Sequence, residues 1–136
     1  MIDYRTGINS IYWEALANLY LQVGLGIGKK DVATLRQAFE GSGKVVTAWH
    51  NGELVGAGRM ITDGIRYGSI FDVGVLPAFQ KQGIGKDIMN ELIKGNEHLY
   101  IHLTSTFGNE LFYSKLGFRR HKTAMAKYPH DSDYLE

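Results

Sequence analysis

The most regular pattern along the chain is helical, and it occurs four times. Apolar residues recur at three- and four-residue spacing, which predicts four helices, over 8–23, 31–41, 84–93 and 111–116. Asn9 or Ser10 would cap the first helix and Asp31 the second, because their side chains can accept from free N–H groups. Glycines then close the helices, at positions 24, 41, 95 and 117.

The remaining apolar runs are typical of strands. β-branched and aromatic residues predict strands over 45–49, 54–61, 67–76 and 99–103. Asn51-Gly52 favours a two-residue hairpin turn, Asp63-Gly64 a second reversal, and Pro77 ends the third strand. The fourth strand follows a helix and should therefore pair in parallel, and the chain is expected to return to strand from Phe118. We expect an α+β fold (mixed α/β) with a mostly antiparallel sheet, one parallel pair and about four flanking helices.

Size and charge limit the function classes. A chain of 136 residues, 44% apolar, fits one domain over 1–136. Its 15 Lys and Arg balance 14 Asp and Glu, so we expect neither a nucleic-acid partner nor a charged membrane partner. There is no Cys, which excludes disulfides and thiolate chemistry and is compatible with a cytoplasmic location. No apolar stretch is long enough to span a bilayer, and the N-terminus is too polar for a secretory signal.

The strongest chemical signal is a glycine loop between the third strand and the third helix. It reads Gln80, Lys81, Gln82, Gly83, Ile84, Gly85 and Lys86. Glycines let the backbone turn tightly, and the helix that follows aims unpaired N–H groups and its positive end at the same point. An anion could bind there, although from these residues alone a plain turn is as good an interpretation.

Two nucleotide-binding motifs do not fit this loop. A Walker A motif needs Gly at position 80 and Ser or Thr at position 87, where the chain has Gln80 and Asp87. A dinucleotide fingerprint needs a third glycine where the chain has Ile88. The five His lack metal-ligand spacing, so no metal is expected, and no Gly-x-Ser-x-Gly nucleophile motif is present.

The loop resembles the signature of the GCN5-related N-acetyltransferase (GNAT) family: Gln or Arg, two residues, Gly, one residue, then Gly or Ala. Gln80, Gly83 and Gly85 occupy those places. The resemblance extends over Asp72–Pro77, which is similar to the family's central strand, and over Phe112–Phe118, which is similar to its closing motif. The order of the expected elements matches as well, and small single-domain arylalkylamine and plant-type members are the most similar.

This resemblance implies a twisted sheet whose parallel pair splays apart to hold acetyl-CoA as cosubstrate. The main chain of Val73 and Val75 would hold the pantetheine arm, with Gly74 easing a distortion of the strand. The segment Gln80–Lys86 would hold the pyrophosphate. Thr106 and Asn109 depart from the Asn and Ala that many relatives carry, which puts their contacts with CoA in doubt.

The resemblance also implies a general acid, Tyr113, which would protonate the departing CoA thiolate. Without the resemblance, Phe112 and Tyr113 would be interpreted as core packing. For the base, some relatives have Glu where this chain has Ser69. Asp72 is the first candidate here, because a carboxylate in an apolar run needs a partner or a purpose. A structural pairing of Asp72 is an equal alternative, and Glu53, His50 and His102 stay open as bases.

The resemblance therefore implies an N-acetyltransferase in which a primary amine of a small molecule or peptide attacks the thioester directly, without a covalent enzyme intermediate. A CoA-binding sensor or interaction module with little activity is the main alternative, and a nucleotide-binding regulator is a third. The loop over 24–30 is expected to be a connector, although Leu25 and Ile27 could instead touch substrate. Exposed strand edges are compatible with a homodimer, and nothing in the sequence identifies the acceptor amine.

Overall fold

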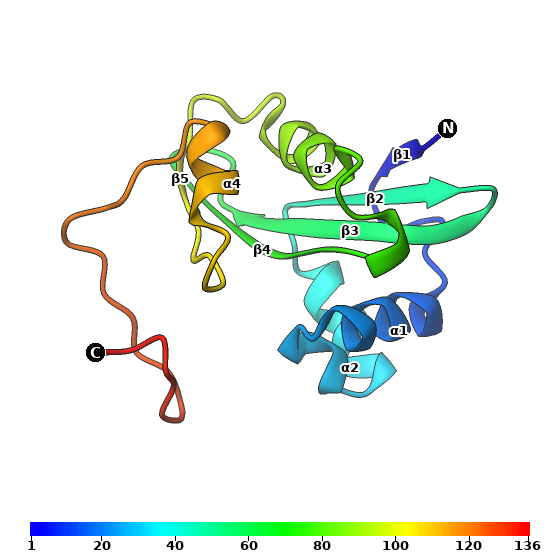
Figure 1. Cartoon of the computed structure of the whole chain (residues 1–136), viewed down its shortest axis with the longest axis horizontal. Helices are drawn as coiled ribbons and strands as arrows, with labels where there is room; N and C mark the ends of the chain where they lie inside the picture. The colour runs from blue at the N-terminus through cyan, green and yellow to red at the C-terminus, as the bar shows by residue number, and fades with distance from the viewer. The chain divides into compact units, whose positions relative to one another are not determined.

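The computed structural model describes residues 1–136, which form two compact units, Met1–Thr104 and Ser105–Glu136. The first unit holds three helices: α1 (Trp13–Val23), α2 (Val32–Glu40) and α3 (Ile84–Ile93) (Figure 1). Two short 3-10 helices, η1 (Gly26–Lys29) and η2 (Pro77–Phe79), lie in its loops. The second unit holds one helix, α4 (Glu110–Lys115). No helix in the chain is long and apolar enough to cross a membrane.

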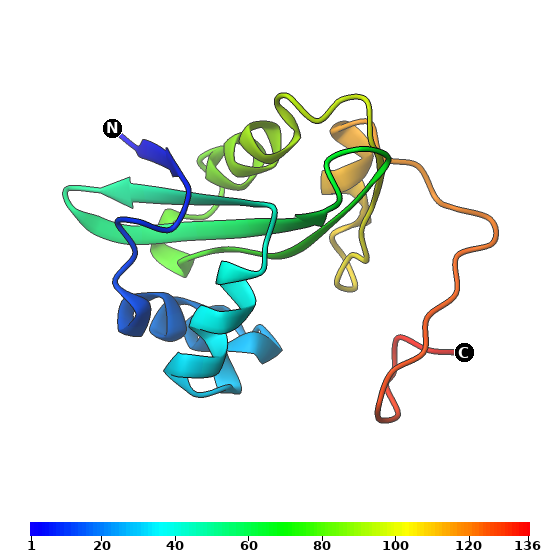
Figure 2. The same ribbon diagram turned by 180° about the vertical axis from the view of Figure 1, so that it is seen from behind.

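A five-stranded sheet forms the centre of the first unit. Its strands are β1 (Asp3–Thr6), β2 (Lys44–His50), β3 (Glu53–Thr62), β4 (Tyr67–Val75) and β5 (Tyr100–His102), and they lie in sequence order. Every pair is antiparallel except β4 and β5, which run parallel. The mixed sheet and the four helices confirm the predicted fold class, whereas β1, the edge strand beside β2, was not predicted (Figure 2).

Helices cover both faces of this sheet. α3 packs on one face, and α1 and α2 pack on the other (Figures 1 and 2). Gly56 and Gly58 in β3 bring α3 close, because a Cβ at either position would come within 3.0 Å of Ile88. On the opposite face, α1 and α2 bury an apolar cluster against the sheet, which includes Leu16, Leu19, Tyr20, Leu35, Phe39, Val45 and Ala57.

The first helix begins later than predicted. It starts at Trp13 with Tyr12 as the capping residue, and no side chain caps it, so the prediction of Asn9 or Ser10 was wrong. Residues 8–11 form a turn instead, in which the N–H of Ile11 donates to the carbonyl of Ile8 over 3.2 Å. Both isoleucines still face the core, so the apolar spacing runs on outside the helix.

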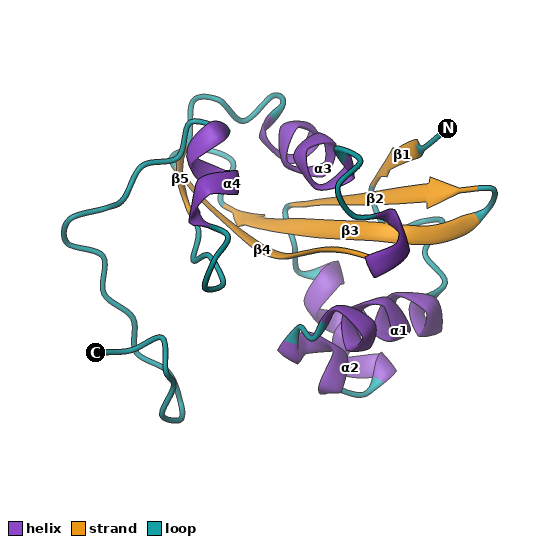
Figure 3. Cartoon of the chain, in the orientation of Figure 1, coloured by secondary structure: helices purple, strands orange, loops and turns teal.

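Two other local predictions had opposite outcomes. Asp31 caps α2 as expected, because its Oδ1 accepts from the N–H of Thr34 over 2.7 Å. The strand predicted from Phe118 does not form, and the chain beyond α4 has no regular structure (Figure 3). Its residues 119–127 are all exposed, so strand pairing there would gain no stability from burying an apolar face.

Candidate functional site

The glycine loop places a row of free N–H groups at the start of α3. Lys81 and Gly83 both adopt the left-handed conformation, with φ of +65° and +85°. Such left-handed turns make the concave backbone nests that bind anions. The N–H groups of Ile84, Gly85 and Lys86 have no acceptor in the protein, and that of Asp87 is the first to bond, to the carbonyl of Gly83 over 3.0 Å. No side chain caps this helix, so the donors are open to a ligand.

The charges around the loop also favour an anion. Lys81 and Lys86 are exposed, and neither takes part in an ion pair. The one carboxylate in the first turn of α3, Asp87, accepts a hydrogen bond from the Tyr4 hydroxyl over 2.7 Å. Burial, followed by the bond to Asp87 and its charge, raises the pKa of Tyr4 well above its ordinary value, so the phenol stays a donor. The two lysines therefore carry the positive charge available to a bound anion.

A side-chain contact ties the loop to the end of β4. The Nε2 of Gln80 donates to the carbonyl of Val75 over 2.9 Å. The intervening η2 turns the chain back, with the N–H of Phe79 bonded to the carbonyl of Leu76 over 2.8 Å. The first residue of the loop and the last residue of the strand are thus held together by a direct bond.

β4 is distorted where the pantetheine contacts are predicted. Its register against β3 shifts between Ala57 and Arg59, because Gly58 faces the two residues Asp72 and Val73. Asp72 takes the left-handed conformation, with φ of +58°. The extra residue makes a β-bulge, which leaves backbone groups outside the ladder. The bulge confirms that the strand is distorted.

The distortion does not lie at Gly74, as the sequence suggested. Gly74 has no positive φ, and its role is to make room. A Cβ there would lie 3.0 Å from Cγ2 of Val23 and 3.5 Å from Cδ1 of Leu25. Glycine at this position lets the end of α1 and the following loop pack directly on β4, which brings Leu25 beside the strand.

The parallel partner of β4 is short. β5 pairs only with Tyr67, Gly68 and Ser69, and its last pair joins Ser69 to His102. From Ile70 to Val75, β4 has no strand on that side. Val73 and Val75 lie in this open stretch and are half-buried. A ligand with amide groups could bond to backbone groups there.

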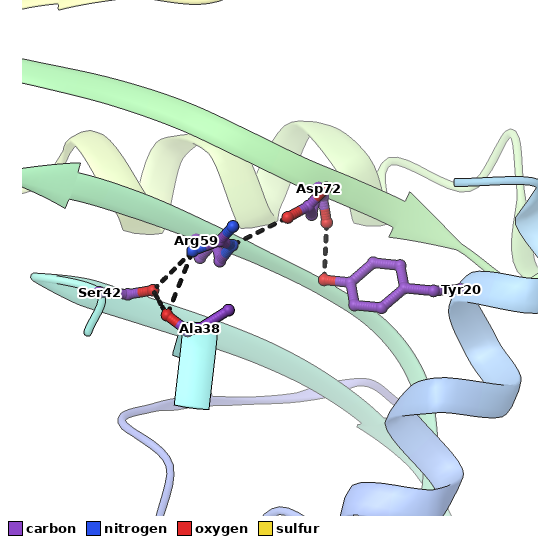
Figure 4. A network of polar contacts seen from close by, with 5 residues as sticks. All are labelled: Tyr20, Ala38, Ser42, Arg59 and Asp72. Carbon is purple, nitrogen blue, oxygen red and sulfur yellow. Dashed lines mark hydrogen bonds and ion pairs between the residues drawn. The ribbon is translucent and has the colours of Figure 1, made fainter. Parts of the chain in front are cut away.

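Asp72 is the centre of a polar network (Figure 4). Its Oδ2 accepts from the Nε of Arg59 over 2.8 Å, and its main-chain carbonyl accepts from the Tyr20 hydroxyl over 2.7 Å. The Nη1 of Arg59 also donates to the carbonyl of Ala38 over 3.2 Å and to Oγ of Ser42 over 3.3 Å. Burial, with the nearby Asp72 charge, raises the pKa of Tyr20 well above its ordinary value, so Tyr20 acts as a donor. Asp72 therefore has the arginine partner that the structural alternative requires, and its role as a base stays a prediction.

The other candidate bases are spread over the sheet. His50 ends β2 with its ring 5.2 Å from that of Phe79, and Glu53 begins β3. His102 ends β5 opposite Ser69. No group of three or more His, Cys, Asp or Glu side chains could hold a metal ion.

Tyr113 lies in α4, within the C-terminal unit. Its ring contacts Phe112 and Phe118, with ring centroids 4.9 and 6.1 Å away. Burial raises the pKa of the Tyr113 phenol, so the hydroxyl keeps its proton at neutral pH. The two departures from the family pattern bond to each other, because the Nδ2 of Asn109 donates to Oγ1 of Thr106 over 2.6 Å.

Sequence reasoning did not identify Tyr20 and Arg59. Tyr20 fits the apolar stripe of α1, and its hydroxyl gave no signal of its own. Arg59 did carry a signal, because a charged residue inside the run Leu54–Ile61 needs a partner. Asp72 has the same property in the neighbouring strand, so pairing the two was within reach of the sequence.

The sequence is similar to those of known acetyltransferases. The sequence model of the acetyltransferase (GNAT) domain matches residues 41–120, more than half of the chain. A Gibberella zeae protein named "Putative acetyltransferase FG08082" is 39% identical over 74 residues, and the chloroplastic GCN5-related N-acetyltransferase 3 of Arabidopsis thaliana is 35% identical over 81. These matches cover 52% and 60% of this chain but only 42% and 33% of the relatives, so the chain spans less than half of their length.

Solved structures agree with this match. The GNAT family acetyltransferase SP0256 of Streptococcus pneumoniae TIGR4 is 28% identical and superimposes with a TM-score of 0.81. The alignment covers 96% of this chain and 100% of that one. The five-stranded mixed sheet with four helices is therefore the fold of these structures.

Proposed function

Because the chain belongs to the acetyltransferase (GNAT) domain family, we propose that it transfers the acetyl group of acetyl-CoA to a primary amine of a small molecule or peptide. The observation that carries this proposal is the row of free N–H groups from Ile84 to Lys86, tied by Gln80 to the end of a bulged strand. A pyrophosphate needs such donors, and the pantetheine amides need backbone groups outside a ladder.

Each part of acetyl-CoA has a proposed contact. The pyrophosphate lies against the loop from Gln80 to Lys86, where Lys81 and Lys86 add charge. The pantetheine arm follows the open edge of β4 and bonds to the main chain of Val73 and Val75. A main-chain N–H near Val73 donates a hydrogen bond to the thioester oxygen and stabilises the negative charge that develops on it. Most of the rate enhancement then comes from holding the amine beside the thioester.

The chemistry requires two proton transfers. The neutral amine attacks the thioester carbon, the carbon–sulfur bond breaks, and the pair of electrons leaves with the CoA sulfur. Tyr113 donates its proton to that thiolate, since a phenol is protonated at neutral pH and burial raises the pKa of Tyr113 further. The nitrogen gives up its proton to a base, and Asp72 is our first candidate for this role.

Binding and turnover need separate tests. Calorimetric titration with acetyl-CoA, CoA and ATP tests the loop, and thiol release across a panel of polyamines, arylalkylamines, amino acids and peptides tests the transfer. The protein has no Cys, so every thiol detected comes from CoA. Binding of acetyl-CoA with amine-dependent thiol release supports the proposal. Binding without release favours the sensor, and binding of ATP alone favours a nucleotide-binding regulator.

A further inference from the structure

We propose that Tyr20 and Arg59 are positioning residues, which hold the β4 bulge at Asp72 so that the main chain of Val73 faces the thioester. This inference rests on the proposed function. It assigns a role to two side chains that bond to Asp72 from α1 and β3. Neither needs to touch acetyl-CoA, since both would act through the backbone conformation of Asp72.

The bulge needs support because of its backbone geometry. Asp72 has φ of +58°, a left-handed conformation that costs free energy for a residue with a Cβ, less for Asp than for most residues, and that contacts around it can hold in place. Two contacts do so: the Tyr20 hydroxyl holds the main-chain oxygen, and Arg59 holds the carboxylate. Between them they fix both the peptide plane that leads into Val73 and the direction of the side chain.

Arg59 is itself held rigidly (Figure 4). Its Nη1 donates to the Ala38 carbonyl, near the C-terminal end of α2, where the helix dipole favours a cation. Its guanidinium lies over the rings of Phe39 and Phe71, 5.4 and 6.0 Å from their centroids. The side chain is only 12% exposed. Arg59 therefore links the bulge to α2 through hydrogen bonds from a side chain whose own position is fixed by packing.

Tyr20 is equally constrained. Its side chain is fully buried, and its ring centroid lies 6.0 Å from that of Phe39. Gly28 in η1 packs against its backbone, since a Cβ at position 28 would lie 2.8 Å from the Tyr20 carbonyl carbon. The hydroxyl can therefore hardly move relative to α1. Tyr20 and Arg59 fix Asp72 from two independent elements.

A contribution to the stability of the fold does not by itself explain why this polar network is present. Buried ion pairs can often be replaced by apolar side chains of similar size without loss of stability. The pair here lies one residue before Val73, inside a bulge that strand pairing does not need. Fixing one backbone conformation is the property that apolar packing would not supply, and catalysis by positioning requires it.

The experiment separates positioning from stability. Tyr20→Phe removes one hydroxyl and keeps the buried ring. Arg59→Gln removes the guanidinium that donates to the Asp72 carboxylate. We expect kcat to fall about 10-fold or more in each variant, because small displacements of reacting groups cost large factors in rate. The Kd for CoA should stay within about 3-fold, because the pyrophosphate loop is untouched. All rates are measured at one common temperature, about 15 °C below the lowest Tm among the variants.

Two control variants match these changes. Tyr12→Phe removes a phenol that donates to Glu14 over 3.2 Å at the start of α1. Arg36→Gln removes an arginine that pairs with Glu40 and lies over the Trp13 ring. Neither side chain forms a hydrogen bond or ion pair with β4, so both controls should keep the kcat of the unmodified protein.

Two outcomes of the kinetic and binding measurements would overturn the proposal. An unchanged kcat in Tyr20→Phe, with a lowered Tm, would overturn it and leave the network a structural role. A Kd for CoA that rises in step with the loss of kcat would overturn it as well. Failure of the unmodified protein to bind acetyl-CoA would instead overturn the proposed function. In that case, amide hydrogen exchange tests the support of the bulge without acetyl-CoA. Unchanged protection of the amides of Asp72–Val75 in Tyr20→Phe would show that Tyr20 does not hold the bulge, and would overturn the positioning role.

Discussion

The side-chain amide of Gln80 donates to the main-chain carbonyl of Val75 over 2.9 Å. This bond joins the first residue of the glycine loop to the last residue of β4. The two segments that we propose to hold the pyrophosphate and the pantetheine arm are therefore fixed relative to each other before a ligand arrives. Preorganisation of this kind improves affinity by reducing the cost of ordering the site.

Replacing Gln80 should therefore weaken binding more than folding. Gln80→Leu removes one exposed hydrogen bond, so we expect a free energy of unfolding lowered by less than about 1 kcal/mol. The Kd for acetyl-CoA should rise about 5- to 10-fold, measured by calorimetry. Gln37→Leu, the same change on the exposed face of α2, is the control. An unchanged Kd in Gln80→Leu would mean that the bond has no part in the site.

Gly83 offers a test of the loop conformation. Its φ of +85° is unfavourable for any residue with a Cβ, so Gly83→Ala should lower the free energy of unfolding by about 1–2 kcal/mol and turn the loop N–H groups away from the ligand. We expect the Kd for CoA to rise at least 10-fold in a calorimetric titration.

A matched control for that strain lies in the β2–β3 hairpin. Gly52 has a φ of +79°, and a Cβ there, as at Gly83, would meet nothing within 4 Å. Gly52→Ala should therefore cost a similar amount of stability without changing the Kd for CoA. If both variants bind CoA like the unmodified protein, the loop does not hold the pyrophosphate.

Tyr113→Phe tests the proposed general acid. The phenol is protonated at neutral pH, with a pKa that burial raises further, and its loss removes the donor to the leaving thiolate. We expect kcat to fall about 100-fold while the Kd for acetyl-CoA changes little, measured by thiol release and by calorimetry. Tyr128→Phe, which removes a phenol from the same C-terminal unit, should leave kcat unchanged. Full turnover in Tyr113→Phe would exclude the residue from the mechanism.

Asp72→Asn separates the two roles open to that carboxylate. Removing its charge leaves Arg59 without an anionic partner, which should lower the free energy of unfolding by about 2–4 kcal/mol in denaturant titrations. If Asp72 is also the base, the acidic limb of the kcat profile against pH should disappear in this variant. A profile of unchanged shape, at reduced height, would assign Asp72 to the structural pair alone.

Asp63 should make stability depend on pH. Its Oδ1 accepts from the N–H groups of Arg66, Ile65 and Tyr67, and these bonds lower the pKa of the carboxyl below 3.8. A lowered pKa in the folded state stabilises the protein fully above about pH 5, and this contribution is lost as the pH falls through the folded-state pKa.

The corresponding variant is Asp63→Ala, compared by thermal unfolding from pH 7 to pH 2.5. Its Tm should lie a few degrees below that of the unmodified protein at pH 7, and the difference should shrink below pH 4. Asp133→Ala, in the C-terminal tail, is the control. A difference that stays constant across the range would contradict the role of the charged carboxylate.

Local signals decided how much of the fold could be predicted. α3 was predicted with its observed bounds because apolar spacing, the glycine loop before it and Gly95 after it all agree. β1 was missed because Asp3–Thr6 is a polar edge strand, whose pairing with β2 comes from the rest of the sheet. The chain from Phe118 was mistaken for a strand because no local signal shows whether a partner exists.

The candidate site divides in the same way. The loop from Gln80 to Lys86 is contiguous, so its sequence predicted a turn into a helix with free N–H groups. The bulge depends on contacts that are distant in sequence, because Tyr20 and Asp72 are separated by 52 residues. Gly74 looked like the residue that would relieve a distortion, whereas Asp72 takes the left-handed conformation and Gly74 makes space for the end of α1.

The short pairing of β5 has a consequence for the order in which the molecule opens. Three residue pairs hold β5 to β4, whereas β3 pairs along most of the length of both its neighbours. β5 should therefore fray at a lower free energy than the rest of the sheet, and its amides should lose protection first. The chain runs on from β5 into the unit that carries Tyr113. The proposed acid is thus joined to the sheet through the strand with the fewest residue pairs, so opening of β5 changes the length of unpaired chain between β4 and Tyr113 while the rest of the sheet stays folded.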